Sequence, residues 1–355
     1  MNPAGSISGP VSARLTNPDD LSSVTQKSRN KPRRKPAAPG EFELIARLVD
    51  GKRLSRRTIL GPGDDCAILA RGKSPTLVTI DSMVEGVHFN LAWGTPEQLG
   101  VRALAVNLSD IAAMGGAPTA CVVNLAIRPG LTIRFFERLY AGLRRAARAA
   151  DVDIVGGNIT SARQLAITIA LLGEAPPRPL RRDGARVGDE IFVTGTLGDA
   201  ALGWRILAGK IRASGTTRRY LEDRYLMPSA RLLAGRLLAR FRPAPAAIDI
   251  SDGLLQDLGH ILDRSRVGAE IDPNSIPVSK AYNAVMDSDL TLAMGGGEDY
   301  ELLFCLRPGR SERALKRLLR TPVRRIGRIV RGRGIRMMDG EMPQVIGWDQ
   351  LRAGS

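Results

Sequence analysis

The chain has 355 residues, of which 43% are hydrophobic and 25% are charged, and its formal net charge is +16. This composition is that of a globular protein with room for two ordinary domains. No apolar run approaches the roughly 18 residues that span a bilayer, and two histidines are too few for a zinc or iron site of the usual kind.

The strong positive charge raises the alternative of a basic nucleic-acid-binding protein. Aromatic residues make up only 4% of the chain, and they are not interleaved with the basic runs as a stacking platform for bases requires. A solvated, arginine-rich surface that attracts anionic small molecules is therefore favoured. We expect neither a nucleic acid nor a membrane as a partner.

The cysteines Cys66, Cys121 and Cys305 each lie in an apolar segment and show no CxxC spacing. They are typical of small core residues in a reducing compartment. The N-terminus has no apolar stretch of the kind found in a secretory signal. Together these features predict a cytoplasmic protein.

Residues 1–38 are rich in serine, proline, asparagine and basic residues and have no apolar periodicity. This composition predicts a disordered basic tail. An organelle transit peptide is the alternative, but Asp19 and Asp20 are unusual in such a segment.

Residues 39–175 are predicted to form an N-terminal α/β domain. An amphipathic helix over 40–50 is followed by the acidic turn LGPGDDCAIL and by a strand that ends at Asp81. A helix over 96–114 begins at a proline and ends at a pair of glycines. A strand, a helix over 132–149 and two more strands complete this unit.

Residues 174–187 concentrate three prolines and four arginines, which marks the boundary to a C-terminal α/β domain over 176–355. In that domain the strand DEIFVTG is followed by the helix GDAALGWRIL and an arginine-rich helix over 229–240. The segments AIDISDG, LLQDLGHILDRS, ELLFCL, ERALKRLL, VRRIGRIV and GIRMM follow. Because strands and helices alternate in both halves, the predicted fold class is α/β (α+β) with two domains.

Carboxylates beside glycines, at the ends of apolar runs, recur along the chain and are typical of sites that hold Mg²⁺ against a polyphosphate. Asn107 and Asp110 are one helical turn apart and can face one ligand. Asp64 and Asp65 point to opposite faces if they lie in a strand, so Asp64 can equally be a turn residue. The carboxylate candidates are Asp64, Asp65, Asp81, Asp110, Asp249, Asp252, Glu298 and Asp299.

Several classes of enzyme are excluded by missing motifs. The chain has no GxxxxGK[ST] loop, no GxGxxG between a strand and a helix, and no HRD or DFG motif. The absence of GxSxG together with the scarcity of histidine disfavours a serine hydrolase.

Six segments in fixed order resemble the thiamine-monophosphate kinase family: GPGDDCAIL, TIDSMVEGVHF, RALAVNLSDIAAMGGAP, RRDGARVGDEIFVTGTLGDAALG, AIDISDGLLQDLGHI and GGGEDYELLF. The resemblance extends from about Gly40 to Trp348. It implies a two-domain aminoimidazole ribotide synthetase-like fold whose N-terminal domain dimerises through its sheet. It also implies phosphorylation of thiamine monophosphate by ATP with several Mg²⁺ ions. ATP-dependent synthetases of the selenophosphate or aminoimidazole ribotide type share this fold and remain alternatives.

The resemblance also implies roles for individual residues. Catalysis would rest on Asp110, which bridges metals, and on Arg182, which contacts the polyphosphate. The implied metal ligands are Asp65, Thr79, Ile80, Asp81, Asp110, Asp249 and Asp252. The implied ATP contacts are Gly157, Asn158, Arg182 and Ser251, and the implied substrate contacts are His88, Glu298 and Trp348.

Some of these positions have a second interpretation or depart from the family pattern. His88 can be a packed residue, and Trp348 can be a cap on the C-terminal core. Ile80 replaces a residue that usually has a hydroxyl, so only its carbonyl can serve a metal. Ala150 replaces an aromatic residue near the nucleotide, and Asn158 replaces an aspartate, which predicts a weaker Mg²⁺ site.

Overall fold

The computed structural model describes residues 54–60, 68–70, 72 and 74–339, together with Leu44, Arg47, Leu48 and Gly347. All of them belong to one folded unit, Ala38–Ser355. The predicted tail over 1–38, the acidic turn with Asp64 and Asp65, and Trp348 lie outside the described residues. No helix in the described part of the chain is both long and apolar enough to cross a bilayer.

The N-terminal half is built on a four-stranded sheet with the strand order β3-β6-β4-β5. Strands β4 and β5 are parallel, whereas β6 is antiparallel to both of its neighbours. The strands are β3 (Thr76–Val84), β4 (Ala117–Ile127), β5 (Asp153–Ser161) and β6 (Ala166–Glu174), and a separate hairpin pairs β1 (Thr58–Leu60) with β2 (Ile68–Leu69).

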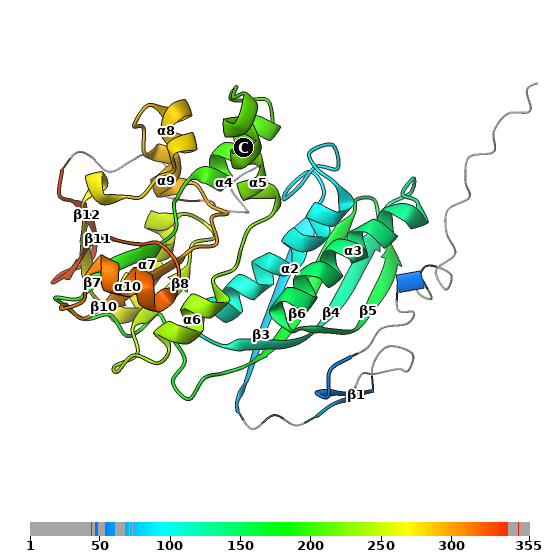
Figure 1. The fold of residues 1–355 in the computed structure, drawn as a ribbon, viewed down its shortest axis with the longest axis horizontal. Coiled ribbons are helices and arrows are strands. Elements are labelled where there is room, and N and C mark those ends of the chain that lie inside the picture. The colour runs from blue at the N-terminus through cyan, green and yellow to red at the C-terminus, as the bar shows by residue number, and fades with distance from the viewer. Residues whose placement is uncertain are drawn as a thin grey trace, which may run out of the picture. The chain divides into compact units, whose positions relative to one another are not determined.

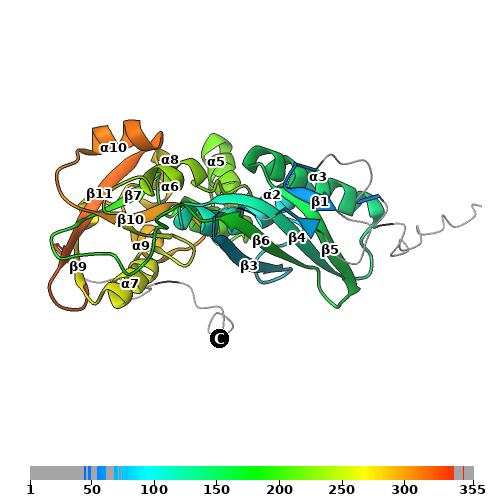
Figure 2. The same ribbon diagram turned by 90° about the horizontal axis from the view of Figure 1, so that it is seen from below.

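Helices α2 (Pro96–Ala113) and α3 (Ile133–Ala150) pack on one face of this sheet (Figures 1 and 2). The predicted helix over 96–114 is confirmed, and Thr95 and Gln98 form a capping box at its start. A Cβ atom on Gly142 of α3 would lie 1.9 Å from the Glu97 carbonyl oxygen. The two helices approach so closely that only glycine fits there.

The opposite face of the same sheet exposes apolar side chains. Val78 is 69% exposed, Ile80 64% and Val122 41%. Ile80 and Val122 both pair with Ala170 of the intervening strand, so they lie in one row across the sheet. This face therefore carries an exposed row of apolar side chains.

The C-terminal half contains a mixed six-stranded sheet with the order β12-β9-β11-β7-β10-β8. Its strands are β7 (Glu190–Thr194), β8 (Ala246–Asp249), β9 (Gly268–Ile271), β10 (Leu302–Leu306), β11 (Val323–Val330) and β12 (Gly334–Met337). Its helices are α4 (Asp199–Leu207), α5 (Gly215–Leu226), α6 (Leu232–Leu238), α7 (Leu254–Ser265), α8 (Lys280–Met286), α9 (Thr291–Gly295) and α10 (Glu312–Leu319), with the 3₁₀ turn η1 (Pro273–Ser275).

Several features of this half differ from the prediction, which has no element for β9, α8 and α9. The helix predicted over 229–240 is shorter, because α6 has only seven residues. Helix α5 was not predicted, because its sequence is polar and buries only Leu221 and Tyr225. Short amphipathic segments give too weak an apolar period for a reliable prediction.

Helix α2 connects the two halves of the structure. It contacts β3 and β6 of the first sheet and also β8 and α6 of the C-terminal half. Residues near the C-terminal end of α2 therefore lie between the two sheets. The predicted site residues on β3 and β8 lie on strands that α2 contacts.

Candidate active site

The centre of the site is Asp110, in the last turn of α2. The Thr79 hydroxyl on β3 donates a hydrogen bond to Asp110 Oδ2. Thr79 and Asp81 are two residues apart in a strand, so their side chains leave the sheet on the same face. The side chain between them, Ile80, lies on the opposite face and is 64% exposed, so only its carbonyl group could serve a metal.

Asp249 brings a carboxylate from the C-terminal half. It ends β8, which contacts α2, and only 5% of it is exposed. Its pKa is raised to about 7, first by burial and then by the negative charge of Asp110, while the Ser109 hydroxyl acts in the opposite direction. The two halves of the chain therefore place carboxylates close enough to disfavour each other's ionisation.

Asp81 belongs to the same cluster. Its pKa is raised to about 6, first by burial and then by the charges of Asp110, Glu298 and Asp252. Burial also raises the pKa of Asp110, against the effects of Thr79 and Arg182. We call Asp81, Asp110, Asp249 and Asp252 the aspartate cluster.

Arg182 is a cation that acts on two members of this cluster. Its charge lowers the pKa of Asp110 and of Asp252, which places the guanidinium group near both. The pKa of Asp252 is nevertheless raised, because burial outweighs the contributions of His260, Gln256 and Arg182. An arginine beside a set of carboxylates can contact the phosphates that the carboxylates alone would repel.

The loop that carries Ser251 and Asp252 is held by Asp257 of α7. Asp257 Oδ2 accepts hydrogen bonds from the backbone N–H groups of Ser251, Asp252 and Gly253, at 3.0, 3.1 and 3.1 Å. The pKa of Asp257 is raised to about 7, mainly by burial and to a smaller extent by the charges of Asp249 and Asp252. The carboxyl group therefore shapes the loop and orients Asp252.

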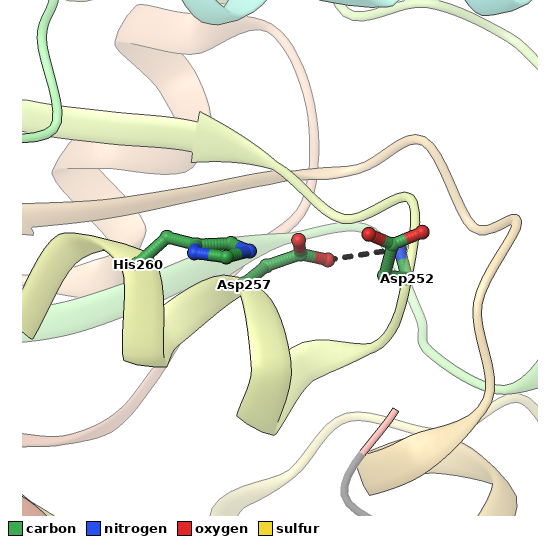
Figure 3. A group of neighbouring side chains, drawn as sticks. All are labelled: Asp252, Asp257 and His260. Carbon is green, nitrogen blue, oxygen red and sulfur yellow. Dashed lines mark hydrogen bonds between the residues drawn. The ribbon is translucent and has the colours of Figure 1, made fainter. Parts of the chain in front are cut away.

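His260 lies one turn further along α7. Figure 3 shows Asp257 and His260 on this helix, directed toward Asp252 in the loop that precedes it. One ligand atom from each of these three residues lies within 4.8 Å of the others. Sequence reasoning missed Asp257 and His260, although their spacing of three residues predicts that they share a helix face.

The signature segment GGGEDYE packs directly on this loop. The N–H groups of Glu298 and Tyr300 donate to the carbonyls of Ser251 and Ile250, at 2.7 and 2.8 Å. A Cβ atom on Gly297 would lie 2.2 Å from the Ser251 oxygen, so that position requires glycine. Glu298 and Tyr300 have positive φ angles of 73° and 52°, an uncommon conformation for such residues and one found at functional sites.

Each acidic side chain of this segment has its own partner. Glu298 Oε2 accepts from Arg102 Nη2 at 2.8 Å and from the Tyr300 hydroxyl at 2.7 Å. Asp299 Oδ2 accepts from the Gly198 N–H at 2.7 Å, at the start of α4. Glu301 is 1% exposed and interacts with Arg224, Arg231 and Thr194.

His88 lies in the turn after β3 and is half-buried. Its Nδ1 accepts a hydrogen bond from the Val84 N–H at 3.1 Å, which assigns the proton of the neutral ring to Nε2. Its carbonyl accepts from the Tyr225 hydroxyl at 2.7 Å. His88 is thus connected to the C-terminal half through α5.

Gly157 and Asn158 are not brought to the aspartate cluster. Asn158 Nδ2 donates to Asn124 Oδ1 at 3.0 Å. Asn124 lies two residues after Val122 on β4, hence on the exposed sheet face that also carries Ile80. Ile80 and Asn158, the two residues of this sheet that depart from the family pattern, therefore lie on one face of the sheet. Thr79 and Asp81 lie on the opposite face. Ala150 packs at the end of α3 against the first core.

The donor set of the aspartate cluster fits Mg²⁺. Four carboxylates and the Thr79 hydroxyl offer hard oxygen ligands. Burial raises the pKa of each of the four carboxyls, and repulsion from other cluster members adds to this for Asp81 and Asp249. A divalent cation bound here would relieve that repulsion. Asp65, which lies outside the described residues, stays a predicted ligand.

A surface groove of about 710 Å³ is separate from this site. It lies on residues of α6 and α10 and their flanking loops, and none of the predicted site residues lines it. Its lining consists of Leu233, Leu237, Arg240, Arg310, Ala314, Arg317, Leu318 and Arg320. The groove contributes to the arginine-rich surface and not to the acidic site.

Two family models match the chain in succession. Residues 63–175 match the N-terminal domain of AIR synthase related proteins, and residues 186–340 match their C-terminal domain. Thiamine-monophosphate kinase from Salmonella typhimurium is 42% identical over 273 residues, which cover 75% of this chain and 82% of that protein. The chain belongs to the thiamine-monophosphate kinase family. A second member, from Aquifex aeolicus, is 35% identical over 87% of this chain and 97% of its own length.

Solved structures agree with membership of the thiamine-monophosphate kinase family. The crystal structure of thiamine-monophosphate kinase from Stenotrophomonas maltophilia has a TM-score of 0.74 and 36% identity, over 84% of this chain and 95% of that one. AaThiL complexed with AMPPCP and TMP has a TM-score of 0.70 and 33% identity, over 87% and 96%. Hydrogenase maturation protein HypE, at 21% identity and a TM-score of 0.69 over 88% of this chain and 94% of that one, shares the fold alone. The predicted two-domain fold of this superfamily is confirmed.

Proposed function

We propose that this chain phosphorylates thiamine monophosphate with ATP to give thiamine diphosphate. The observation that carries the proposal is the convergence of Asp81, Asp110, Asp249 and Asp252 with Arg182, in a chain of the thiamine-monophosphate kinase family. A related structure holds AMPPCP and TMP together, which are an ATP analogue and the proposed acceptor.

We further propose that the aspartate cluster, Thr79 and the Ile80 carbonyl hold several Mg²⁺ ions, with Asp65 as an additional ligand. ATP and a phosphomonoester bring roughly five to six negative charges together, and bound Mg²⁺ supplies the neutralisation that lets them approach. The carboxylates that would hold these ions come from both halves of the chain. Phosphates held between the two halves would therefore be shielded from water.

The residues of the chain supply positioning and charge rather than a general base. The attacking phosphate oxygen of the acceptor is already ionised at neutral pH, so no side chain needs to remove a proton from it. Arg182 would contact the polyphosphate, and so would Ser251, whose loop is held by Asp257. His88 and Glu298 would orient the acceptor, and Gly157, Asn158 and Trp348 stay predicted ligand contacts.

The test is a direct assay of the product. Purified protein is incubated with thiamine monophosphate, ATP and Mg²⁺, and thiamine diphosphate and ADP are separated by chromatography. We expect equal amounts of the two products, and none when EDTA is present. ADP without thiamine diphosphate would contradict the proposed acceptor and leave the fold assignment intact.

We also propose that the protein is a homodimer that pairs the exposed faces of its N-terminal sheets. The support is the apolar row formed by Ile80, Ala170 and Val122, with Val78 beside it. Such an apolar face is typical of an interface. Val122→Glu is expected to give a monomer in size-exclusion chromatography with light scattering, and an unchanged dimer would contradict this interface.

A cytoplasmic location is proposed on the thiols. Cys121 and Cys305 are free and buried, and burial raises the pKa of Cys121 to about 12. Buried thiols of this kind are inert core residues, as expected in a reducing compartment.

A further inference from the structure

Arg102 is a buried cation whose role the reaction described above does not explain. It lies on α2, is 2% exposed, and is among the largest side chains that the described chain buries. It precedes Asp110 by eight residues, so both side chains lie near one face of the helix. A buried guanidinium group is costly unless it is paired and hydrogen-bonded.

Arg102 joins two elements that carry predicted substrate contacts. Its Nη2 donates to Glu298 Oε2 at 2.8 Å, and its Nη1 donates to the Tyr225 carbonyl. The guanidinium carbon lies 3.8 Å from the centre of the Tyr225 ring, a cation–π contact. The Tyr225 hydroxyl in turn donates to the His88 carbonyl at 2.7 Å. A continuous set of contacts thus runs from Glu298 through Arg102 and Tyr225 to His88.

The contacts on Glu298 are all on one oxygen. Arg102 and Tyr300 both donate to Oε2. Among the described residues, none donates a hydrogen bond to Oε1. The side chain of Glu298 is 29% exposed, so the fixed carboxylate keeps a second oxygen available to a ligand.

The charge of this oxygen indicates which part of a ligand it meets. A carboxylate repels phosphate groups, whereas thiamine monophosphate also has a cationic thiazolium ring and an aminopyrimidine. Glu298 is therefore suited to the ring portion of the acceptor and not to ATP. Holding it in one orientation lowers the entropy lost on binding.

We propose that Arg102 is a positioning residue that fixes Glu298 and the His88 turn as one wall of the acceptor site. The proposal rests on the proposed function, because it assigns this wall to the ring portion of thiamine monophosphate. It predicts that Arg102 controls the KM for thiamine monophosphate and leaves the KM for ATP almost unchanged. If Arg102 only stabilised the fold, its substitution would change both KM values together or would change only the melting temperature.

The experiment compares Arg102→Met and Arg102→Lys with a matched control, Arg138→Met. Arg138 also makes one ion pair, to Glu97 at 2.6 Å, but its side chain is 45% exposed on α3. Kinetic constants are measured for thiamine monophosphate at saturating ATP, and for ATP at saturating thiamine monophosphate. We expect Arg102→Met to raise the KM for thiamine monophosphate about tenfold or more, and the KM for ATP less than about twofold.

The conservative variant gives a second readout. Lysine keeps the positive charge beside Glu298 but cannot also donate to the Tyr225 carbonyl in the same fork geometry. Arg102→Lys should therefore recover part of the affinity for thiamine monophosphate. If Arg102→Met is not obtained folded, Tyr300→Phe removes the other donor to Glu298 Oε2 and should raise the same KM about threefold.

A double variant tests whether Arg102 acts through Glu298. If it does, Arg102→Met combined with Glu298→Gln should raise the KM for thiamine monophosphate no further than the more severe single variant. Effects that multiply would overturn the proposed role, as would equal changes in both KM values. Wild-type protein that forms no thiamine diphosphate would overturn the proposed function as well. Active wild type with unchanged constants in the Arg102 and Tyr300 variants would overturn the positioning role alone.

Discussion

Two neighbouring groups of buried acidic residues differ in how their charge is balanced. In the aspartate cluster, burial and neighbouring carboxylates raise the pKa values of Asp81 and Asp249 to about 6 and 7. In the signature segment, by contrast, arginines contact Glu298 and Glu301. The arginines hold Glu298 and Glu301 in place, and of these two only Glu298 is partly exposed, with one oxygen left for a ligand. Within the described part of the chain, the aspartate cluster has no such ion pairs and keeps its carboxylates for cations.

The largest effect on catalysis is expected at Asp110, the centre of the aspartate cluster. Asp110→Asn keeps the size of the side chain and removes one charge, so it should reduce kcat roughly 100-fold or more. The melting temperature of the metal-free protein should not fall, because the substitution relieves repulsion on Asp249. Steady-state kinetics and thermal unfolding measure the two effects. Turnover like that of the wild type would show that Asp110 is not at the centre of the site.

Removing a paired carboxylate from the signature segment should instead lower the stability of the protein. Glu301→Gln removes the buried carboxylate of Arg231 and leaves Arg224 with Asp199 alone, so it should lower the free energy of unfolding by about 3 kcal/mol. The matched control is Glu312→Gln, whose partner Arg324 lies at 3.5 Å with a side chain that is 51% exposed. That control should cost less than about 1 kcal/mol. Equal losses in chemical denaturation would contradict the contrast drawn between the two groups.

The pH dependence of stability should also distinguish them. The folded carboxyls of Asp81 and Asp249, with pKa values of about 6 and 7, keep their protons up to about those pH values, whereas the unfolded chain releases them near the ordinary aspartate pKa of 3.8. The free energy of unfolding of metal-free protein should therefore fall as pH rises from about 4 to 7. Mg²⁺ should reduce this fall, because it binds the ionised carboxylates. A fall of the same size with and without Mg²⁺ would exclude the cluster as the cation site.

The smallest effect is expected on the open face of the N-terminal sheet. The sequence predicts that Asn158→Asp lowers the Mg²⁺ requirement, since aspartate is usual there. In the structure, Asn158 pairs with Asn124 across the sheet from Thr79 and Asp81. The Mg²⁺ concentration for half-maximal activity should therefore change less than about twofold. A tenfold decrease would show that this face also takes part in binding metal.

Part of the site follows from local sequence patterns. Asp81 at the end of an apolar strand and Asp110 one turn after Asn107 can be located from periodicity and spacing. Their meeting with Asp249 cannot, because it depends on the packing of α2 against β8. The roles of individual residues came from the family resemblance and not from the periodicity.

The contacts that support the site were the least predictable. Arg102 is a charged residue in an apolar helix, which signals a buried partner, but the sequence does not say that the partner is Glu298, 196 residues away. Helix α5, which supplies Tyr225, buries few of its residues and gave no apolar period. Long-range ion pairs and weakly amphipathic helices are set by tertiary packing, which local patterns do not encode.

The central claim is that the aspartate cluster binds divalent cations and the signature segment does not. It is tested most directly by counting bound Mn²⁺, a Mg²⁺ substitute detectable by electron paramagnetic resonance, in the presence of a non-hydrolysable ATP analogue. Wild type and Glu301→Gln should bind the same number of ions, and Asp249→Asn should bind fewer. An unchanged number in Asp249→Asn, or a loss confined to Glu301→Gln, would contradict the account.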